Sequence, residues 1–246
     1  MAWSTADIPD LTGHTAVVTG GNGGLGLETV RALADAGAHV VIAARNQAKA
    51  ADAESEVRTT VPEASLEIVE LDLGSQASVR AAAEQIVAAH ETIDLLINNA
   101  GLMALPERRT EDGFEMQFGV NHLGHWSLTA LLLEPILAAE AARVVTVTST
   151  AHHTGRAVDP DNPHLQGRYG PWKAYGQSKL ANFHFSIGLQ RQFDAAGVRT
   201  ASLSAHPGLT NSDLQTHSAE ESGGTLAKLS VTAANLTGMD LSLIHI

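Results

Sequence analysis

The sequence predicts a single α/β domain with a doubly wound fold, in which helices cover both faces of a parallel sheet in three layers. Short apolar segments rich in β-branched residues alternate with segments of helical periodicity. A glycine-rich turn separates the first predicted strand from the first predicted helix. The 246 residues are enough for one large core, and no linker or internal repeat divides them.

The predicted elements follow from this alternation. Strands are expected where apolar residues run together, over 15–18, 40–43, 66–71, 93–97, 144–147 and 200–203. Beyond the helix after the glycine turn, helices are expected over 47–60, 76–89, 114–139 and 174–196, with 114–139 bent or ended near Pro135. Ligands of such folds gather at the carboxyl ends of the strands, so the residues after each strand are the candidates for function.

Composition argues against several classes of protein. The chain has 15 Lys and Arg against 27 Asp and Glu and no basic run, so we expect no nucleic-acid surface. Without cysteine it has no disulfide, zinc-thiolate site or thiol nucleophile. The first residues resemble no export signal, and charged residues and a proline interrupt the most apolar stretch, 128–147. We therefore expect no membrane span and a cytoplasmic location.

The glycine-rich turn is predicted to hold a pyrophosphate. Gly20, Gly24 and Gly26 stand between a strand and a helix, with Asn22 and Leu25 in the same turn. There, backbone N–H groups and the positive end of the helix dipole can face a phosphate, and the absence of Cβ atoms allows a close approach. The alternative is that the glycines only make a tight connection. The first two glycines are one residue further apart than in the usual Gly-x-Gly-x-x-Gly pattern.

The end of the second strand favours NADP(H) over NAD(H). Arg45 and Asn46 stand where an NAD-binding chain usually has an Asp or Glu for the ribose 2′-hydroxyl. An arginine can instead bind a 2′-phosphate. NADP(H) is therefore the preferred cofactor and NAD(H) the alternative, unless Arg45 only caps a solvated loop.

The next two strands end in further candidate cofactor contacts. Asp72, with its neighbour Leu73, could accept a hydrogen bond from the adenine amino group, or it could form only a short acidic turn. Asn99, Ala100 and Gly101 follow the fourth strand and would form a wall of small residues beside the cofactor.

The strongest chemical signal is the pair Tyr175 and Lys179, which at i, i+4 lie on one face of a helix. A tyrosine has an ordinary pKa of about 10, and lowering it toward 7 requires about 4 kcal/mol of preferential stabilisation of the phenolate. A nearby ammonium group and an oxidised nicotinamide could supply this. Ser149, after the fifth strand, completes a candidate catalytic set.

Together these motifs resemble the short-chain dehydrogenase/reductase superfamily, whose glycine motif has the longer spacing. The similarity rests on Thr19-Gly20-x-x-x-Gly24-x-Gly26, Asn99-Ala100-Gly101, Asn121, Ser149, Tyr175-x-x-x-Lys179 and Pro207-Gly208. A closer resemblance, to the retinol-dehydrogenase-like branch that includes WW-domain oxidoreductases and protochlorophyllide reductases, rests on residues 112–119, Asn121-His-Leu-Gly-His125, Tyr175 to Asn182 and His206-Pro-Gly. The resemblance covers 11 to about 210 and implies a Rossmann fold; the lack of cysteine speaks against protochlorophyllide reductase.

The resemblance implies a role for each candidate residue. Tyr175 would be the general acid in reduction and the general base in oxidation, and Ser149 would hydrogen-bond the substrate oxygen. Lys179 would lower the tyrosine pKa and bind the nicotinamide ribose, while Asn121 would hold a water in a proton relay. The nicotinamide end would be contacted by Pro207, Gly208 and Thr210. The implied function is hydride transfer between NADP(H) and a carbonyl or alcohol substrate, which the resemblance to this branch implies is lipophilic.

Three further expectations complete the prediction. No metal is expected, because the resemblance places His122 and His125 on a structural helix and explains the chemistry without a metal. His152 and His153 are likewise not assigned as metal ligands. Tyr169 and Trp172 either line the substrate mouth or serve packing. Relatives in the superfamily often pair through two long helices, here 114–139 and 174–196, which makes a homodimer the expected partner state.

The C-terminal part departs from the family pattern. A domain over 11–240 is expected to lack the last strand, and 220–239 could form a loop and one helix. Residues 241–246 match a translated sequencing adapter and are expected to be a non-native tail, or else an unusual short terminus. The sixth strand would then be an unpaired edge. Two other functions therefore stay open: a dinucleotide sensor without turnover, and an inactive truncated fragment.

Overall fold

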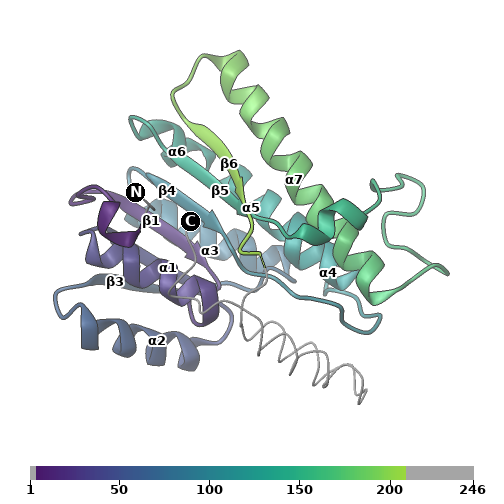
Figure 1. Ribbon diagram of the computed structural model, residues 1–246, viewed down its shortest axis with the longest axis horizontal. Coiled ribbons are helices and arrows are strands. Elements are labelled where there is room, and N and C mark those ends of the chain that lie inside the picture. Colours follow the sequence, from purple (N-terminus) through teal and green to yellow (C-terminus); the bar gives the residue numbers. More distant parts are fainter. Residues whose placement is uncertain (1–3, 209–246) are drawn as a thin grey trace.

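The structure is a computed structural model that describes residues 4–208, and its centre is a six-stranded parallel sheet (Figure 1). The strands lie in the order β3-β2-β1-β4-β5-β6. They are β1 Thr15–Thr19, β2 His39–Ala44, β3 Ser65–Glu70, β4 Leu95–Asn98, β5 Arg143–Val147 and β6 Ala201–Ala205. The order reverses between β1 and β4, which is the switch point of a doubly wound sheet. The predicted fold class is confirmed.

Helices connect successive strands. They are α1 Gly24–Asp35, α2 Gln47–Thr60, α3 Gln76–Ala89, α4 Met116–Phe118, α5 His125–Leu131, α6 Leu133–Ala138 and α7 Pro171–Ala196, with a π-helix η2 at Gly119–Gly124 and 3₁₀ turns at Thr5–Asp7 and Thr150–Thr154. Local signals explain their ends: Asn46 caps α2 by accepting from the Lys49 amide at 3.0 Å, and α7 ends at Gly197 with φ of 66°. Within residues 4–208 no helix is both long enough and apolar enough to cross a membrane.

The long helix predicted over 114–139 is not continuous. It is divided into α4, the π-helix η2, α5 and α6. The break between α5 and α6 falls at Leu132, whose φ and ψ are −92° and 5°. Pro135 has no N–H to donate to the Leu131 carbonyl, so the ladder cannot run through this turn. The π-helix was not predicted, and it contains Asn121.

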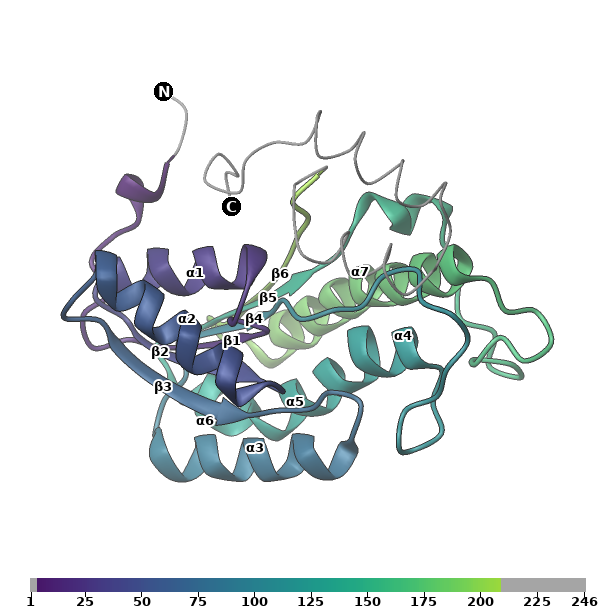
Figure 2. The same ribbon diagram turned by 90° about the horizontal axis from the view of Figure 1, so that it is seen from below.

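Two hydrophobic cores lie on opposite faces of the sheet, which makes three layers (Figure 2). Along β1, Ala16 and Val18 point to one face and Val17 to the other. The first face packs against α1 and α2 through Val30, Ala34, Ala50 and Val57. The second packs against α3, α5, α6 and α7 through Val79, Ile86, Leu128, Ile136 and Phe193. Each fully buried Val or Ile side chain contributes about 1.5–3 kcal/mol.

This arrangement brings the carboxyl ends of β1, β4 and β5 side by side, because neighbouring strands are parallel and in register. Within the described residues β6 is the edge strand beside β5. The expected helix within 220–239, the boundary at 240 and the tail 241–246 lie outside the described residues. The division into a domain over 11–240 and a tail therefore stays a prediction.

Candidate active site

The glycine turn between β1 and α1 has the shape that the prediction requires. Gly20 and Gly24 have positive φ angles of 65° and 51°, a region that side-chain-bearing residues rarely adopt. A Cβ atom on Gly26 would collide with the Gly20 carbonyl oxygen and would lie 2.6 Å from Asn99 Nδ2. Among residues 4–208 no side chain caps the start of α1, where Gly23 is the N-cap, and the first turn of this helix has no acidic residue. The first N–H groups of α1 are therefore free to bind an anion.

Thr19 joins the ends of β1 and β4. Its Oγ1 accepts from the amides of Asn99 at 2.9 Å and Ala100 at 3.0 Å. In return, Asn99 Nδ2 donates to the Thr19 carbonyl at 2.8 Å. Thr19 is fully buried, so these contacts replace all contact with water. The predicted wall of small residues is thus fixed against the glycine turn.

His125 extends this connection to the π-helix. Its Nδ1 lies 3.0 Å from the Asn121 carbonyl oxygen, which can only accept, so Nδ1 carries the proton. Its Nε2 lies 2.8 Å from Thr19 Oγ1. Burial lowers the pKa of His125 to about 4, so the ring is neutral at pH 7 and Nε2 accepts from the Thr19 hydroxyl. The orientation of Thr19 and the backbone of Asn121 are therefore coupled through one imidazole.

The Asn121 side chain is fully buried and makes three hydrogen bonds. Its Oδ1 accepts from the Leu102 amide at 2.7 Å, and its Nδ2 donates to the Leu102 carbonyl at 2.9 Å and to Ser178 Oγ at 2.9 Å. Ser178 Oγ in turn donates to the Tyr175 carbonyl at 2.8 Å. The amide is thus held between the turn after β4 and the start of α7.

Tyr175 and Lys179 lie one turn apart on α7, and both are buried. The Lys179 Nζ atom is 5.8 Å from the centre of the Tyr175 ring and donates to the Val147 carbonyl at 3.1 Å. Burial lowers the pKa of Lys179 to about 8. A Cβ atom on Gly101 would lie 3.6 Å from Lys179 Nζ and 3.3 Å from Asn121 Oδ1, so these two polar atoms flank the same glycine.

The Tyr175 phenol lies near Ser149, the residue predicted to share its site. Ser149 is half-buried at the carboxyl end of β5, and its Oγ accepts from the Ala151 amide at 3.2 Å. Burial raises the pKa of Tyr175, and the nearby Ser149 hydroxyl lowers it by a smaller amount. The net shift is upward, opposite to the lowering expected from Lys179. The reason is that desolvation of the phenolate outweighs the stabilisation that the protein's own groups provide.

The residues expected to contact the adenosine part of the cofactor make fewer hydrogen bonds with the rest of the protein than the catalytic set does. Arg45 is exposed and has no hydrogen-bond or ion-pair partner within residues 4–208. Asn46 is engaged as the cap of α2. Asp72 Oδ1 accepts from the Gly74 amide at 2.8 Å, so the acidic turn is formed, while Leu73 is buried in the core beside α3.

The strand-end turn after β6 is described only in part. Gly208 has a φ of 69°, and its amide lies 3.3 Å from His206 Nδ1, with Pro207 between them. Thr210 lies outside the described residues.

Several supporting polar residues on α7 and directly after β5 were given no role from the sequence. Asn182 accepts from His122 Nδ1 at 3.1 Å through Oδ1 and donates to the Val147 carbonyl at 3.3 Å. Thr148 Oγ1 donates to the Lys179 carbonyl at 2.9 Å. Ser178 and Asn182 follow Tyr175 at i+3 and i+7, so helical spacing could have indicated both.

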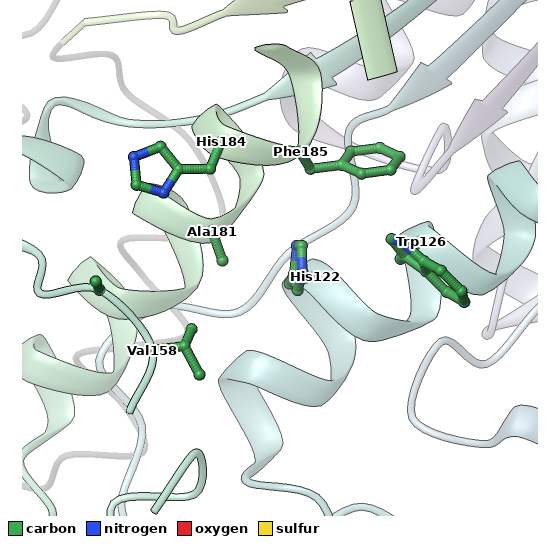
Figure 3. Close-up of a pocket in the computed structure, with 7 residues that line it drawn as sticks. His122, Trp126, Val158, Ala181, His184 and Phe185 are labelled. Carbon is green, nitrogen blue, oxygen red and sulfur yellow. The ribbon is translucent and has the colours of Figure 1, made fainter. Parts of the chain in front are cut away.

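A separate groove of about 430 Å³ lies between α7 and the η2–α5 helix (Figure 3). Its lining comes from both helices and from the loop before α7: His122, Trp126, Ala157, Val158, Ala181, His184 and Phe185. Neither Tyr175 nor Ser149 lines it. The groove is therefore a feature of the outer helix surface and not of the candidate catalytic set.

Comparisons with known proteins agree with this geometry. Residues 14–223 match the family model described as short chain dehydrogenase. The human protein Retinol dehydrogenase 12 is 44% identical over 210 residues, which cover 85% of this chain and 65% of that protein. The chain thus spans about two thirds of the length of this curated relative.

Solved structures are also similar. An uncharacterized protein from Mycobacterium Paratuberculosis is 42% identical with a TM-score of 0.76, covering 96% of this chain and 81% of that one. An Escherichia coli CFT073 dehydrogenase complexed with NADPH is 22% identical, with a TM-score of 0.70 and coverages of 94% and 93%. One from Burkholderia phymatum in complex with NAD is 20% identical, with a TM-score of 0.72 and coverages of 96% and 84%. The family model and the relatives above 40% identity lead to one conclusion: the chain belongs to the short chain dehydrogenase family.

Proposed function

We propose that this protein is an NADP(H)-dependent oxidoreductase that transfers a hydride between the nicotinamide and a carbonyl or alcohol substrate. The observation that carries the proposal is that Ser149 lies close enough to the Tyr175 phenol to lower its pKa, with Lys179 one helical turn away. A phenol and a hydroxyl beside one another define a place where a substrate oxygen can be bound by both.

The described residues fit a nicotinamide dinucleotide. The open start of α1 and the close approach at Gly26 suit a pyrophosphate. Lys179 Nζ has one hydrogen-bond partner within residues 4–208, the Val147 carbonyl, although an ammonium group has three donors. The remaining donors are available for the ribose hydroxyls. When bound, the cofactor supplies or accepts the hydride.

The chain's own residues handle the proton. In reduction, Tyr175 donates its phenolic proton to the substrate oxygen while Ser149 hydrogen-bonds the same oxygen. In oxidation, Tyr175 acts as the base. Its raised pKa favours the acid form, so Tyr175 would act as a base only where positive charge, such as that an oxidised nicotinamide would supply, stabilises the phenolate. Lys179 and Asn121 flank Gly101, and water in that space would connect Lys179 to solvent.

The preference for NADP(H) rests on Arg45. This arginine follows β2, is exposed, and has no partner among the described residues. A free guanidinium can bind a 2′-phosphate bidentately, whereas no carboxylate stands at that position to bind a 2′-hydroxyl. The Asp72 Oδ2 atom has no hydrogen bond within the described part, so it supports the proposed contact to adenine beside the acidic turn.

A lipophilic substrate is proposed. Trp172 is 63% exposed and packs edge-on against Tyr175, with ring centres 5.9 Å apart. An exposed indole beside the proposed acid offers an apolar contact to a substrate that has its oxygen at Tyr175. Relatives named retinol dehydrogenases are consistent with this class.

Fluorescence titration of the purified chain with NADPH and with NADH tests the cofactor, and turnover of aliphatic and aromatic aldehydes and ketones tests the chemistry. We expect tighter binding of NADPH and measurable reduction. The variant Tyr175→Phe should bind NADPH normally and lose about 10³-fold in turnover, the range of general acid catalysis. Binding without turnover in the wild type would favour a dinucleotide sensor. Unchanged turnover in Tyr175→Phe would refute the catalytic assignment.

We also propose a homodimer that forms through the η2–α5 helix and α7. Trp126 is 53% exposed at the groove between these helices, and Leu131 and Ile187 are exposed on the same two elements. A second copy would cover these apolar side chains. Light scattering should give the mass of a dimer for the wild type and of a monomer for Trp126→Glu. A monomeric wild type would contradict the proposal.

The cytoplasmic location stays a prediction that cell fractionation can test.

A further inference from the structure

A cluster of two histidines and a glutamate lies at the end of the sheet opposite the candidate active site. His39 is the first residue of β2, Glu67 is the third residue of β3, and His90 is the C-cap of α3. The register pairs Val41 with Glu67, so His39 and Glu67 share the face that packs against α3 (Figure 2). The three side chains therefore meet where the end of α3 covers the start of the sheet.

The geometry points to a divalent transition-metal site formed by His39, Glu67 and His90, and we propose Zn²⁺ as the ion that fits it best. One atom from each residue lies within 4.8 Å of the other two. His90 Nε2 is 2.9 Å and His39 Nε2 is 3.5 Å from Glu67 Oε2. Ligands at about 2.0–2.2 Å from a tetrahedral zinc are about 3.3 Å apart, so small side-chain movements would complete the site. His90 Nε2 now donates to the Glu67 carboxylate, and its proton would be released to solvent when the metal binds.

The hydrogen bonding around His39 supports a ligand role. Its Nδ1 lies 2.7 Å from Ser65 Oγ, and donation to that hydroxyl leaves the lone pair on Nε2. His39 Nε2 is shielded from solvent and has no hydrogen-bond partner within the described part of the chain. Its 3.5 Å distance from Glu67 is within ion-pair range but too long for a good hydrogen bond. A metal ion would satisfy this atom, and Ser65 would orient the ring as outer-shell partners do.

The exposure of the cluster allows an ion to enter. The side chains of His39, Glu67 and His90 are 30%, 27% and 13% exposed. The ligands are thus half-buried and leave room for water as the fourth ligand. Two imidazole nitrogens and a carboxylate oxygen are a set that zinc and its neighbours bind well, whereas Mg²⁺ and Ca²⁺ prefer oxygen alone. Bound metal would tie α3 to β2 and β3 and so stabilise the fold.

The experiment is a calorimetric titration of the untagged, chelator-treated chain with Zn²⁺. We expect one site per chain, lost or weakened by about tenfold or more in His39→Gln, Glu67→Gln and His90→Gln. His14→Gln is the matched control, because His14 is also a half-exposed histidine paired with a carboxylate, Asp94 at 2.9 Å. Its titration should equal that of the wild type.

Two further measurements distinguish loss of a metal ligand from misfolding of a variant. Co²⁺ bound in the wild type should show the visible absorption of a tetrahedral site, and His90→Gln should lose it. Ser65→Ala removes no ligand and should weaken Zn²⁺ binding by a smaller factor than the ligand variants. Zinc binding that is equal in all variants and in the control, or that has no site of single stoichiometry, would overturn the proposal.

Discussion

The two ends of the parallel sheet both gather polar side chains, but they hold them in different ways. At the carboxyl end, Thr19, His125 and Asn121 are buried and connected by hydrogen bonds from the glycine turn to the π-helix. At the amino end, His39 and Glu67 are half-buried, and the Nε2 atom of His39 has no hydrogen-bond partner among residues 4–208. The comparison teaches that burial with complete hydrogen bonding fixes protonation and orientation, whereas a half-exposed cluster keeps atoms available for a ligand.

The largest expected effect comes from breaking the buried network at His125. In His125→Phe the Thr19 hydroxyl and the Asn121 carbonyl both lose a partner while staying buried. The Thr19 hydroxyl can still donate to the Ile97 carbonyl at 3.3 Å, so the lost hydrogen bonds cost about 1–3 kcal/mol in total. The larger phenyl ring in this fully buried site adds about 1–3 kcal/mol of overpacking, so we expect a loss of about 4 kcal/mol in the free energy of unfolding. Urea denaturation followed by circular dichroism measures it.

The matched control for this variant is His153→Phe, because His153 is exposed and outside the network. It should change the unfolding free energy by less than about 0.5 kcal/mol, as surface substitutions usually do. Equal losses in the two variants would show that the network does not stabilise the fold.

Acid should break the same network in the unmodified chain. The pKa of His125 falls from an ordinary 6.5 to about 4 on folding, because burial disfavours the charged ring and Lys179 and His122 repel it. Between these values the unfolded chain binds more protons, so stability is present above pH 6.5 and is lost as the pH falls through 4. The loss attributable to His125 is about 3 kcal/mol.

Urea denaturation at several pH values between 7 and 4 measures this loss. His125→Phe should show a shallower decline than the wild type, since the titrating ring is absent. Parallel declines would mean that the acid sensitivity comes from other groups, among them His122, whose pKa is also lowered by burial.

A methyl group at Gly26 should damage the glycine turn. In Gly26→Ala the added carbon meets the Gly20 carbonyl oxygen and Asn99 Nδ2, and neither is the flexible end of a long side chain. Such overpacking costs about 1–3 kcal/mol, and we expect about 2 kcal/mol of lost stability together with weaker NADPH binding. Gly188→Ala on α7 is the control, because within the described part of the chain no atom outside its own helix backbone lies within 4 Å of the added carbon. NADPH binding that is equal in both variants would contradict a phosphate-binding role for the turn.

The sequence predicted much of this architecture because its strongest signals are local. Apolar runs placed the strands to within about two residues, and Tyr175 and Lys179 share a helix face as their spacing required. The break expected near Pro135 is present at Leu132, but the π-helix around Asn121 was not predicted, because it depends on tertiary contacts with Leu102 and Ser178. No periodicity in the sequence reports such contacts.

The network and the amino-end cluster escaped prediction for the same reason. Thr19 and His125 are 106 positions apart, and His39, Glu67 and His90 meet only because of strand register and the end of α3. The direction of the Tyr175 pKa shift could not be derived either, because it depends on how deeply the phenol is buried.

The smallest expected effect is a loss of NADPH affinity on substitution of Arg45, an exposed residue at the carboxyl end of the sheet. Arg45 has no partner among residues 4–208, so, like the amino-end cluster, it is free to bind a ligand. Arg45→Ala should weaken NADPH binding by about tenfold, near 1.4 kcal/mol for an exposed charge-assisted contact, and should leave NADH binding unchanged.

Fluorescence titration with both cofactors measures this difference, with Arg199→Ala as the control. Arg199 is an exposed arginine paired with Glu140 and should alter neither affinity, although it removes the same charge. An equal loss of affinity for NADPH and NADH in Arg45→Ala would mean that the guanidinium only attracts both anionic cofactors by its positive charge. Loss for NADPH alone would mean that it binds the 2′-phosphate directly, because that group is the only difference between the two ligands.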